Sequence, residues 1–218
     1  MATVGLREVE NPSAVFLEEH GDKRVGAAIF PALEGSRPML CEVQALTNYS
    51  PMAMPRRTAV GLDINRVHML VAVLDKFIGM ELSHEDVFLN VVGGLRLTEP
   101  ASDLAVVAAL WSSKSFRELP KAAVFLGELG LTGEIRSTVF AEDRLKEAAK
   151  LGFKIAYMPT ANKRLVKGSP VLKDIECRWL DDVNHLARQL NRDTLPGTPK
   201  IARPRPNPAP LPREDLDM

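Results

Sequence analysis

Five arginines stand where an expected strand or helix begins or ends, and their guanidinium groups could bind a phosphate backbone. They are Arg56, Arg57, Arg66, Arg96 and Arg136. A guanidinium group holds several N–H donors in one plane, which suits phosphate oxygens, and side chains at the ends of elements can project together on one rim. The five arginines could therefore form a rim that binds a phosphate backbone, such as that of DNA, without reading its sequence.

The same arginines have a second possible role as partners of carboxylates. Asp63, Glu99 and Glu128 lie in neighbouring segments, so some of the arginines could form salt bridges within or between subunits. The chain has only two Trp and two Tyr, too few for a base-stacking platform, so backbone electrostatics would have to dominate DNA binding. Both roles stay open at this point.

Other motifs of catalytic and metal sites are missing from the sequence. It contains no Gly-Lys pair, so it has no Walker A loop for nucleotide phosphates, and two separated cysteines, Cys41 and Cys177, do not make a zinc pattern. His68 has no ligand spacing around it and is expected to be a surface or half-buried histidine. Glu134 and Glu142 are expected to be solvated carboxylates. No metal or cofactor is expected in this chain.

The composition indicates one ordinary domain. The 218 residues balance 28 Lys+Arg against 28 Asp+Glu, so the net charge neither requires nor excludes a nucleic-acid partner. No apolar stretch reaches the length of a membrane span, and two cysteines do not make a disulfide framework. We expect a cytoplasmic protein with reduced thiols and no membrane contact.

Hydrophobic periodicity predicts an α+β fold of interleaved strands and helices. Strands are expected at 24–33, 38–47 and 56–62, in one antiparallel sheet, and then at 86–95, 121–131, 154–159 and about 175–180. Helices are expected at 63–78, capped by Asp63 and Gly79, then from Leu104, over 141–152, and from Val183 to about Asn191. Residues 132–140 are expected to form a turn and a short strand.

Three regions follow from this pattern. Residues 1–22 are expected to be a leader, 23–192 the folded domain, and 193–218 a tail. The tail holds seven of the sixteen prolines and no aromatic residue, a composition typical of disordered, polyproline-II-prone chain.

Long segments of the chain resemble a known family. NPSAVFL, LEGSRPMLCEVQALT, PRRTAVGLDINR, VFLNVVGGLRLTEPASDLAVVAAL and FLGELGLTGEIRSTVFAEDRLKEAAKLGFKIA are similar, in order, to the C-terminal domain of the bacterial RadA (Sms) DNA-repair ATPases. The resemblance implies a ribosomal-protein-S5 domain-2-like fold, as in the Lon proteolytic domain, and a ring-shaped hexamer. It also implies that ATP, Mg and Zn bind in family domains that this chain lacks.

The resemblance to Lon can be followed to the two catalytic positions. Lon-type peptidases use a serine nucleophile and a lysine that must be neutral to accept its proton. Matching the segments puts Ala101 at the serine and Glu142 at the lysine. A displaced pair, Ser102 with Lys146, is the alternative, although Ser102 beside Asp103 is expected to be a helix N-cap.

These observations lead to an expected function. The chain is interpreted as a pseudo-protease domain and not an enzyme. It is expected to serve ring oligomerisation and non-specific binding of single-stranded DNA, in the processing of recombination intermediates alongside RecA. A pure hexamerisation scaffold without DNA contact is the alternative.

Overall fold

The computed structural model describes residues 25–35 and 37–194 and confirms the α+β class. Its strands are β1 (Ala27–Glu34), β2 (Arg37–Tyr49), β3 (Arg57–Val60), β4 (Glu85–Val91), β5 (Ala123–Phe125), β6 (Glu128–Leu129), β7 (Ile135–Arg136), β8 (Ile155–Pro159) and β9 (Glu176–Leu180). The α-helices in the described residues are α2 (Ile64–Ile78), α3 (Asp103–Ser115), α4 (Ala141–Lys150) and α5 (Val183–Asp193). Short 3₁₀ helices are η1 (Leu82–His84), η2 (Val92–Gly94), η3 (Pro100–Ser102), η4 (Thr160–Arg164) and η5 (Pro170–Lys173).

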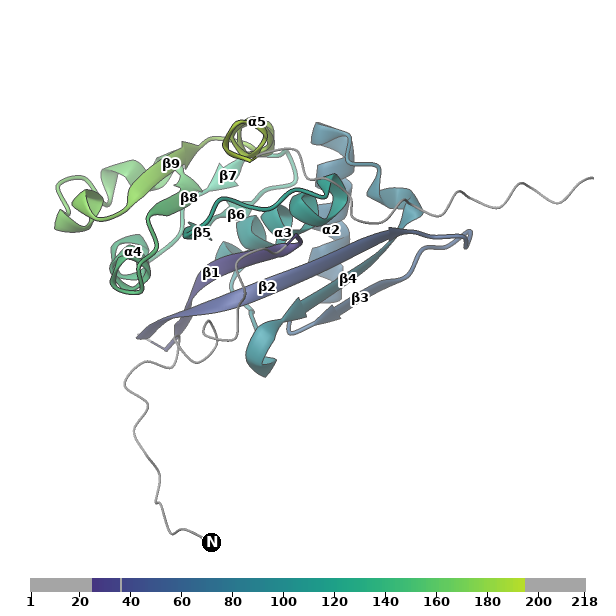
Figure 1. Ribbon diagram of the computed structural model, residues 1–218, viewed down its shortest axis with the longest axis horizontal. Coiled ribbons are helices and arrows are strands. Elements are labelled where there is room, and N and C mark those ends of the chain that lie inside the picture. The colour runs from purple at the N-terminus through teal and green to yellow at the C-terminus, as the bar shows by residue number, and fades with distance from the viewer. Residues whose placement is uncertain (1–24, 36, 195–218) are drawn as a thin grey trace, which may run out of the picture.

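Seven strands form one mixed sheet in the order β3-β4-β2-β1-β5-β8-β9 (Figure 1). The pairs β1/β2 and β2/β4 are antiparallel, whereas β3/β4, β1/β5, β5/β8 and β8/β9 are parallel. The prediction that the first three strands form one antiparallel sheet is right for β1 and β2 and wrong for β3. Helix α2 carries the chain from the end of β3 back to the start of β4, and such a crossover makes a parallel pair.

Helix α2 begins and ends where the sequence predicts. The Oδ1 atom of Asp63 accepts a hydrogen bond from the backbone N of Arg66 at 2.9 Å, and Gly79 ends the helix in the left-handed conformation. The buried side chains Val67, Leu70 and Leu74 lie on the expected face. Phe77 falls at the same helical spacing but is 36% exposed because it lies in the last turn.

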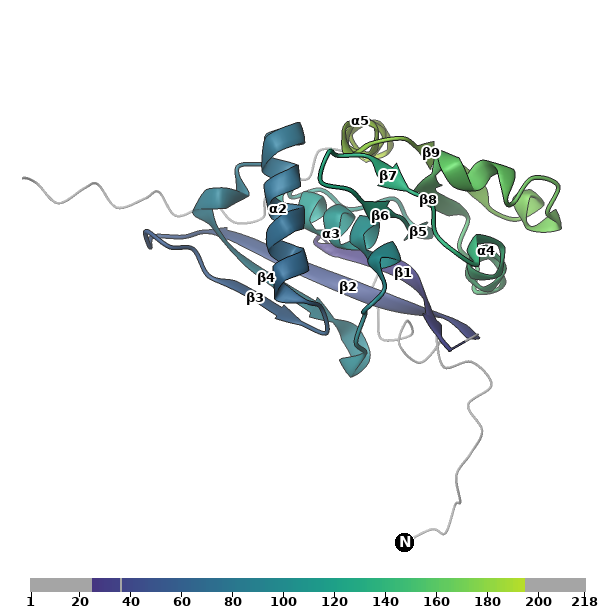
Figure 2. The same ribbon diagram turned by 180° about the vertical axis from the view of Figure 1, so that it is seen from behind.

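Helix α3 is the centre of the core. The sequence predicts one buried face, but every residue from Asp103 to Ser112 is buried. The helix packs on β1, β2 and β5 of the main sheet, and it also contacts α2 and the short strand β6. Figure 2 shows α2 in front of the sheet beside α3. A helix covered on all sides explains why its sequence carries no polar face.

The second half of the chain surrounds the parallel strands. Helices α4 and α5 lie on opposite sides of the β8–β9 part of the sheet in both views (Figures 1 and 2). The expected short strand after the turn is β7, which pairs only with β6 in a separate two-stranded sheet. Helix α5 ends at Asp193, two residues beyond its expected end at about Asn191. The leader 1–22 and the tail from residue 195 lie outside the described residues.

No helix in the part of the chain that the structure describes is long and apolar enough to cross a membrane.

Gly61 fixes the turn from β3 into α2. Its backbone has φ +80°, and its carbonyl oxygen accepts a hydrogen bond from the backbone N of Leu97 at 2.8 Å. A Cβ atom at this position would lie 2.4 Å from the carbonyl oxygen of Leu95. Only glycine allows the segment around Arg96 to pack this closely against the turn.

We predict that Gly61→Ala destabilises the fold by about 3 kcal/mol, because the substitution adds a backbone clash to the cost of a left-handed alanine. The matched control is Gly94→Ala, where φ is +71° but an added Cβ meets nothing within 4 Å, and about 1 kcal/mol is expected. Urea unfolding measures both. Equal losses in the two variants would show that the close approach at Gly61 does not matter.

Candidate functional site

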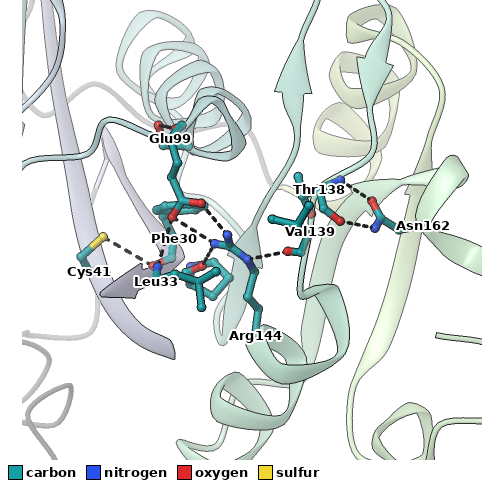
Figure 3. A network of polar contacts seen from close by, with 10 residues as sticks. Phe30, Leu33, Cys41, Glu99, Thr138, Val139, Arg144 and Asn162 are labelled. Atoms are coloured by element: carbon teal, nitrogen blue, oxygen red, sulfur yellow. Dashed lines mark hydrogen bonds and ion pairs between the residues drawn. The ribbon is translucent and has the colours of Figure 1, made fainter. Parts of the chain in front are cut away.

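A buried arginine joins α4 to the segment that leads into η3 (Figure 3). Arg144 has a side chain that is 0% exposed, and its guanidinium group forms a two-pronged ion pair with the carboxylate of Glu99. Its Nη1 also donates to the carbonyl oxygen of Pro31 at 2.5 Å, and its Nε donates to that of Val139 at 3.1 Å. The guanidinium carbon lies 5.5 Å from the ring centroid of Phe30.

This network compensates for the burial of a full charge. A buried guanidinium group is stable only when its N–H donors and its charge are matched by partners. Glu99 is itself held in place because its Oε1 accepts a hydrogen bond from the backbone N of Leu33 at 3.1 Å. The Arg144–Glu99 pair therefore connects α4, β1 and the start of η3, which are the elements that carry or neighbour positions 101 and 142.

Ala101 and Glu142 offer no nucleophile and no amine base. Ala101 is buried, and its carbonyl oxygen accepts a hydrogen bond from the backbone N of Gly127 at 2.9 Å. Glu142 is partly exposed and accepts hydrogen bonds from Lys146 and from the hydroxyl of Ser169, both at 2.9 Å. The hydrogen bond from Lys146, and to a smaller extent that from Ser169, lowers the pKa of Glu142 below its usual value. Glu142 is therefore an ionised surface carboxylate.

The alternative pair Ser102 and Lys146 is also not assembled. Ser102 is buried, and its hydroxyl donates to the carbonyl oxygen of Glu99 at 2.8 Å. Ser102 occupies the expected N-cap position of α3, but its side chain makes no capping hydrogen bond, because η3 runs directly into α3 and Ser102 already has helical backbone angles. The hydrogen bond to Glu142 raises the pKa of Lys146, which opposes the neutral form that a general base needs.

The remaining candidate residues are His68, Glu134 and the two cysteines. His68 is exposed on α2. Glu134 accepts hydrogen bonds from Thr132 and Arg136, and these contacts, with that of Thr132 the largest, lower its pKa to about 2. Burial raises the pKa of the Cys41 thiol to about 12 and that of Cys177 to about 11. In residues 25–35 and 37–194, no group of His, Cys, Asp or Glu side chains could hold a metal ion.

Two of the five arginines are bound to carboxylates of the same chain. Arg66 pairs with Asp103, which is 2% exposed, and its Nη2 donates to the carbonyl oxygen of Leu129 at 2.8 Å. Arg136 pairs with Glu134 and lies 3.5 Å from a carboxylate oxygen of Glu128. For these two, the structure shows the salt-bridge role that the sequence left open, although Arg66 pairs with Asp103 and not with Asp63.

The guanidinium groups of the other three arginines form no ion pair within the described residues, although Asp86 accepts a hydrogen bond from the backbone N of Arg56 at 2.7 Å and feels the charge of its side chain. Arg56 and Arg96 are exposed, and Arg57 is half-buried with its Nη2 3.4 Å from the carbonyl oxygen of Leu82. Arg57 begins β3 and Arg96 lies beyond the end of β3, next to Gly61, so roughly 13 Å of strand separates the two places. The expected single rim is therefore divided between the two ends of β3.

Arg96 also lines a cavity of about 640 Å³ between the β3–α2 turn and the segment that leads into α3. Arg66, Glu99, Ser102 and Asp103 line the same cavity. The sequence did not reveal that Arg66 binds Asp103 or that Arg144 binds Glu99. The partners are 37 and 45 residues apart, so no local spacing brings them together.

The chain matches the model of a known protein family. The family model described as subunit ChlI of Mg-chelatase matches residues 44–162, which is more than half of the 218 residues. The chain belongs to this family.

The ChlI-family chain is also similar to curated proteins named DNA repair protein RadA. The relative from Rickettsia bellii is 53% identical over 153 residues, which is 70% of this chain and 34% of the relative. Relatives from Salmonella typhimurium and Escherichia coli are 49% and 48% identical over 162 residues, which is 74% of this chain and 35% of each relative. The chain thus spans about a third of their length. The expected resemblance to RadA proteins is therefore confirmed over this part of their length.

These matches correct the expectation that the chain is not an enzyme. The ChlI match and the RadA relatives point to an ATPase-type region. The expectation drew too broad a conclusion from one missing motif. A missing Gly-Lys pair excludes one kind of phosphate-binding loop in these residues, but it does not exclude that they are part of an ATPase.

We predict that Arg66→Leu loses about 3 kcal/mol of stability at pH 7, because it leaves the buried Asp103 carboxylate without its partner. Burial already raises the pKa of Asp103, and loss of Arg66 raises it further. A carboxyl group whose folded pKa lies above its unfolded value destabilises the fold as pH rises through that range. The deficit should therefore be smaller near pH 4 than at pH 7.

Arg96→Leu is the matched control, because Arg96 is exposed and has no carboxylate partner in the described chain. Its stability should stay within about 0.5 kcal/mol of the wild-type value at both pH values. Urea unfolding at the two pH values measures the difference. A deficit in Arg66→Leu that does not change with pH would contradict the role assigned to the Arg66–Asp103 pair.

Proposed function

We propose that residues 25–194 form the Lon-like domain of a RadA-type DNA repair protein, in which the domain serves ring assembly and DNA contact. The observation that carries the proposal is the identity of about half, over 70% or more of this chain, with proteins named DNA repair protein RadA. The α+β fold with the segment before α3 joined to α4 supports a Lon-like arrangement. Ala101 and Glu142 would then stand where a Lon peptidase has its serine and lysine.

The domain would work as part of an ATP-driven protein. The ChlI match points to an ATPase-type region, and the relatives are about three times as long as the matched segment. Under this proposal the nucleotide, its Mg²⁺ and a zinc ion bind in parts of the protein that correspond to the rest of the relatives' length. The domain would contribute a homohexameric ring and a surface for DNA. The protein would process recombination intermediates alongside RecA.

Arg56, Arg57 and Arg96 are the proposed DNA contacts. Their guanidinium groups form no direct ion pair within the described residues, in contrast to those of Arg66 and Arg136. A cation that is already paired within the protein releases few counterions when a phosphate approaches, so it adds little to binding. The contacts would be to the backbone of single-stranded DNA and would not read sequence.

We predict that the affinity of the full chain for a fluorescein-labelled oligo(dT) of about 30 nucleotides falls steeply with salt. Three backbone contacts on a single strand give a slope of log affinity against log salt of about −2. Arg56→Ala/Arg57→Ala should weaken binding and reduce the slope to about −1. Fluorescence anisotropy between about 50 and 200 mM salt measures both quantities.

The control for this experiment is Arg188→Ala, which removes an exposed arginine from α5. It should leave the slope unchanged. Affinity that does not depend on salt, or that is the same in the double variant and the wild type, would refute DNA binding by this surface.

A scaffold without DNA contact is the second candidate. Leu46 of β2 and Val60 of β3 are 60% and 54% exposed, and they line an open hollow on the sheet together with Phe88. Apolar side chains exposed on a sheet face favour a contact between subunits. Light scattering on the same samples separates the candidates. A ring that ignores oligo(dT) supports the scaffold, and a monomer that ignores it contradicts both.

A further inference from the structure

A surface that combines cations with exposed apolar side chains lies beside the start of α4. We call it the basic-apolar patch, and it consists of Val139, Phe140, Lys163, Arg164, Leu165 and Lys167. Val139, Phe140 and Leu165 are 66%, 63% and 66% exposed. All three cations are exposed. Nothing in the proposed DNA contact uses these residues.

Two ties hold the two segments of the patch side by side. The side chain of Asn162, which is fully buried, donates to the carbonyl oxygen of Thr138 at 2.8 Å and accepts from its backbone N at 3.0 Å (Figure 3). Farther along, the hydroxyl of Ser169 donates to Glu142 at 2.9 Å. The two segments are therefore joined on either side of the patch, with residues 139 and 140 on one segment and residues 163–167 on the other.

Phe140 is placed unfavourably for the stability of its own helix. It occupies the N-cap position of α4 in the left-handed conformation, with φ +53°, and it makes no side-chain capping hydrogen bond. Asparagine, aspartate or glycine would suit this position better, because they cap the helix or tolerate the backbone angle. An exposed ring that brings strain and no cap indicates that the side chain serves an external contact.

The charges of the patch define what can cover it. Lys163, Arg164 and Lys167 have no carboxylate within ion-pair distance in the described chain, whereas Lys146 on the neighbouring helix α4 has two. A partner must therefore bring carboxylates together with apolar side chains. A nucleic-acid strand would match the cations and stack on Phe140, but its phosphates would gain little from Val139 and Leu165. The mixture favours a peptide.

This chain contains such a peptide near the end of its sequence. Residues 214–218 read Glu-Asp-Leu-Asp-Met, so three carboxylates alternate with Leu216 and Met218. We propose that residues 214–218 bind the basic-apolar patch, with the carboxylates on Lys163, Arg164 and Lys167 and the apolar side chains against Phe140 and Leu165. The interaction is independent of DNA binding and of the ring.

The length of chain between the fold and this segment permits the contact. Glu214 lies twenty positions after Thr194, the last described residue. A chain of that length spans at most about 70 Å, whereas a domain of some 170 residues has a radius of gyration of about 15 Å. Residues 214–218 can therefore reach the patch of the same chain or that of a neighbouring copy.

Zero-length cross-linking of the full chain tests the proposal. A carbodiimide joins a lysine amine to a carboxylate that touches it, and forms an amide with net loss of water. We expect cross-links from Lys163 and Lys167 to Glu214, Asp215 or Asp217, identified by mass spectrometry after digestion. The Lys146–Glu142 pair, at 2.9 Å, is the internal positive control. Mixing ¹⁵N-labelled with unlabelled protein separates contacts within one chain from contacts between copies.

Two variants show that the apolar part of the patch matters. Phe140→Gly removes the ring at a position where glycine suits the backbone, so the fold should be retained. Leu216→Asp/Met218→Asp keeps every carboxylate of the segment. Each should lower the cross-link yield at least fivefold. Leu131→Gln, which changes an exposed apolar residue in the turn between β6 and β7, should not change it.

The proposal is overturned if the Lys146–Glu142 cross-link forms but none reaches residues 214–217. It is also overturned if Phe140→Gly and Leu216→Asp/Met218→Asp cross-link as well as the wild type, because contact would then be by charge alone. If Lys163→Glu/Lys167→Glu weakens oligo(dT) binding and no cross-link to the tail forms, the patch belongs to nucleic acid instead.

Discussion

Arg144 brings a full positive charge to a position with no solvent exposure, and the surrounding structure is arranged to match it. Carbonyl oxygens from β1 and from the segment before α4 accept its hydrogen bonds, and the carboxylate of Glu99 neutralises its charge. Without these partners the guanidinium group could not stay buried. The positions of α4, of β1 and of the entry into η3 are therefore coupled through one side chain.

The coupling has a consequence for the site. Under the proposed Lon-like arrangement, the start of η3 and the start of α4 would stand where a Lon peptidase holds its nucleophile and its base. Here the same two elements are joined by Arg144 and Glu99, while Ala101 is buried and Glu142 faces Lys146 and Ser169. A second ion pair, Arg66 with Asp103, joins α2 to α3. These two ion pairs hold the helices in place, and the exposed cations are left to contact binding partners.

Much of the fold follows from local patterns in the sequence, but the pairing of charges does not. Apolar periodicity, Asp63 and Gly79 are sufficient to predict α2, because a helix and its caps are local features. The parallel partner of β3, the complete burial of α3 and the roles of Arg66 and Arg144 depend on contacts across 30 or more residues. The conclusion that the chain is no enzyme failed for another reason, since a missing motif in one segment does not describe the whole protein.

A double-mutant cycle on Glu99 and Arg144 tests the central claim, that their ion pair holds α4 on the body of the domain. Urea unfolding would give the free energies for Glu99→Gln, Arg144→Met and the double variant. We expect Arg144→Met alone to cost about 3 kcal/mol or more, and the two single losses to exceed the loss in the double variant by about 2 kcal/mol. Losses that add to within about 0.5 kcal/mol would contradict the claim.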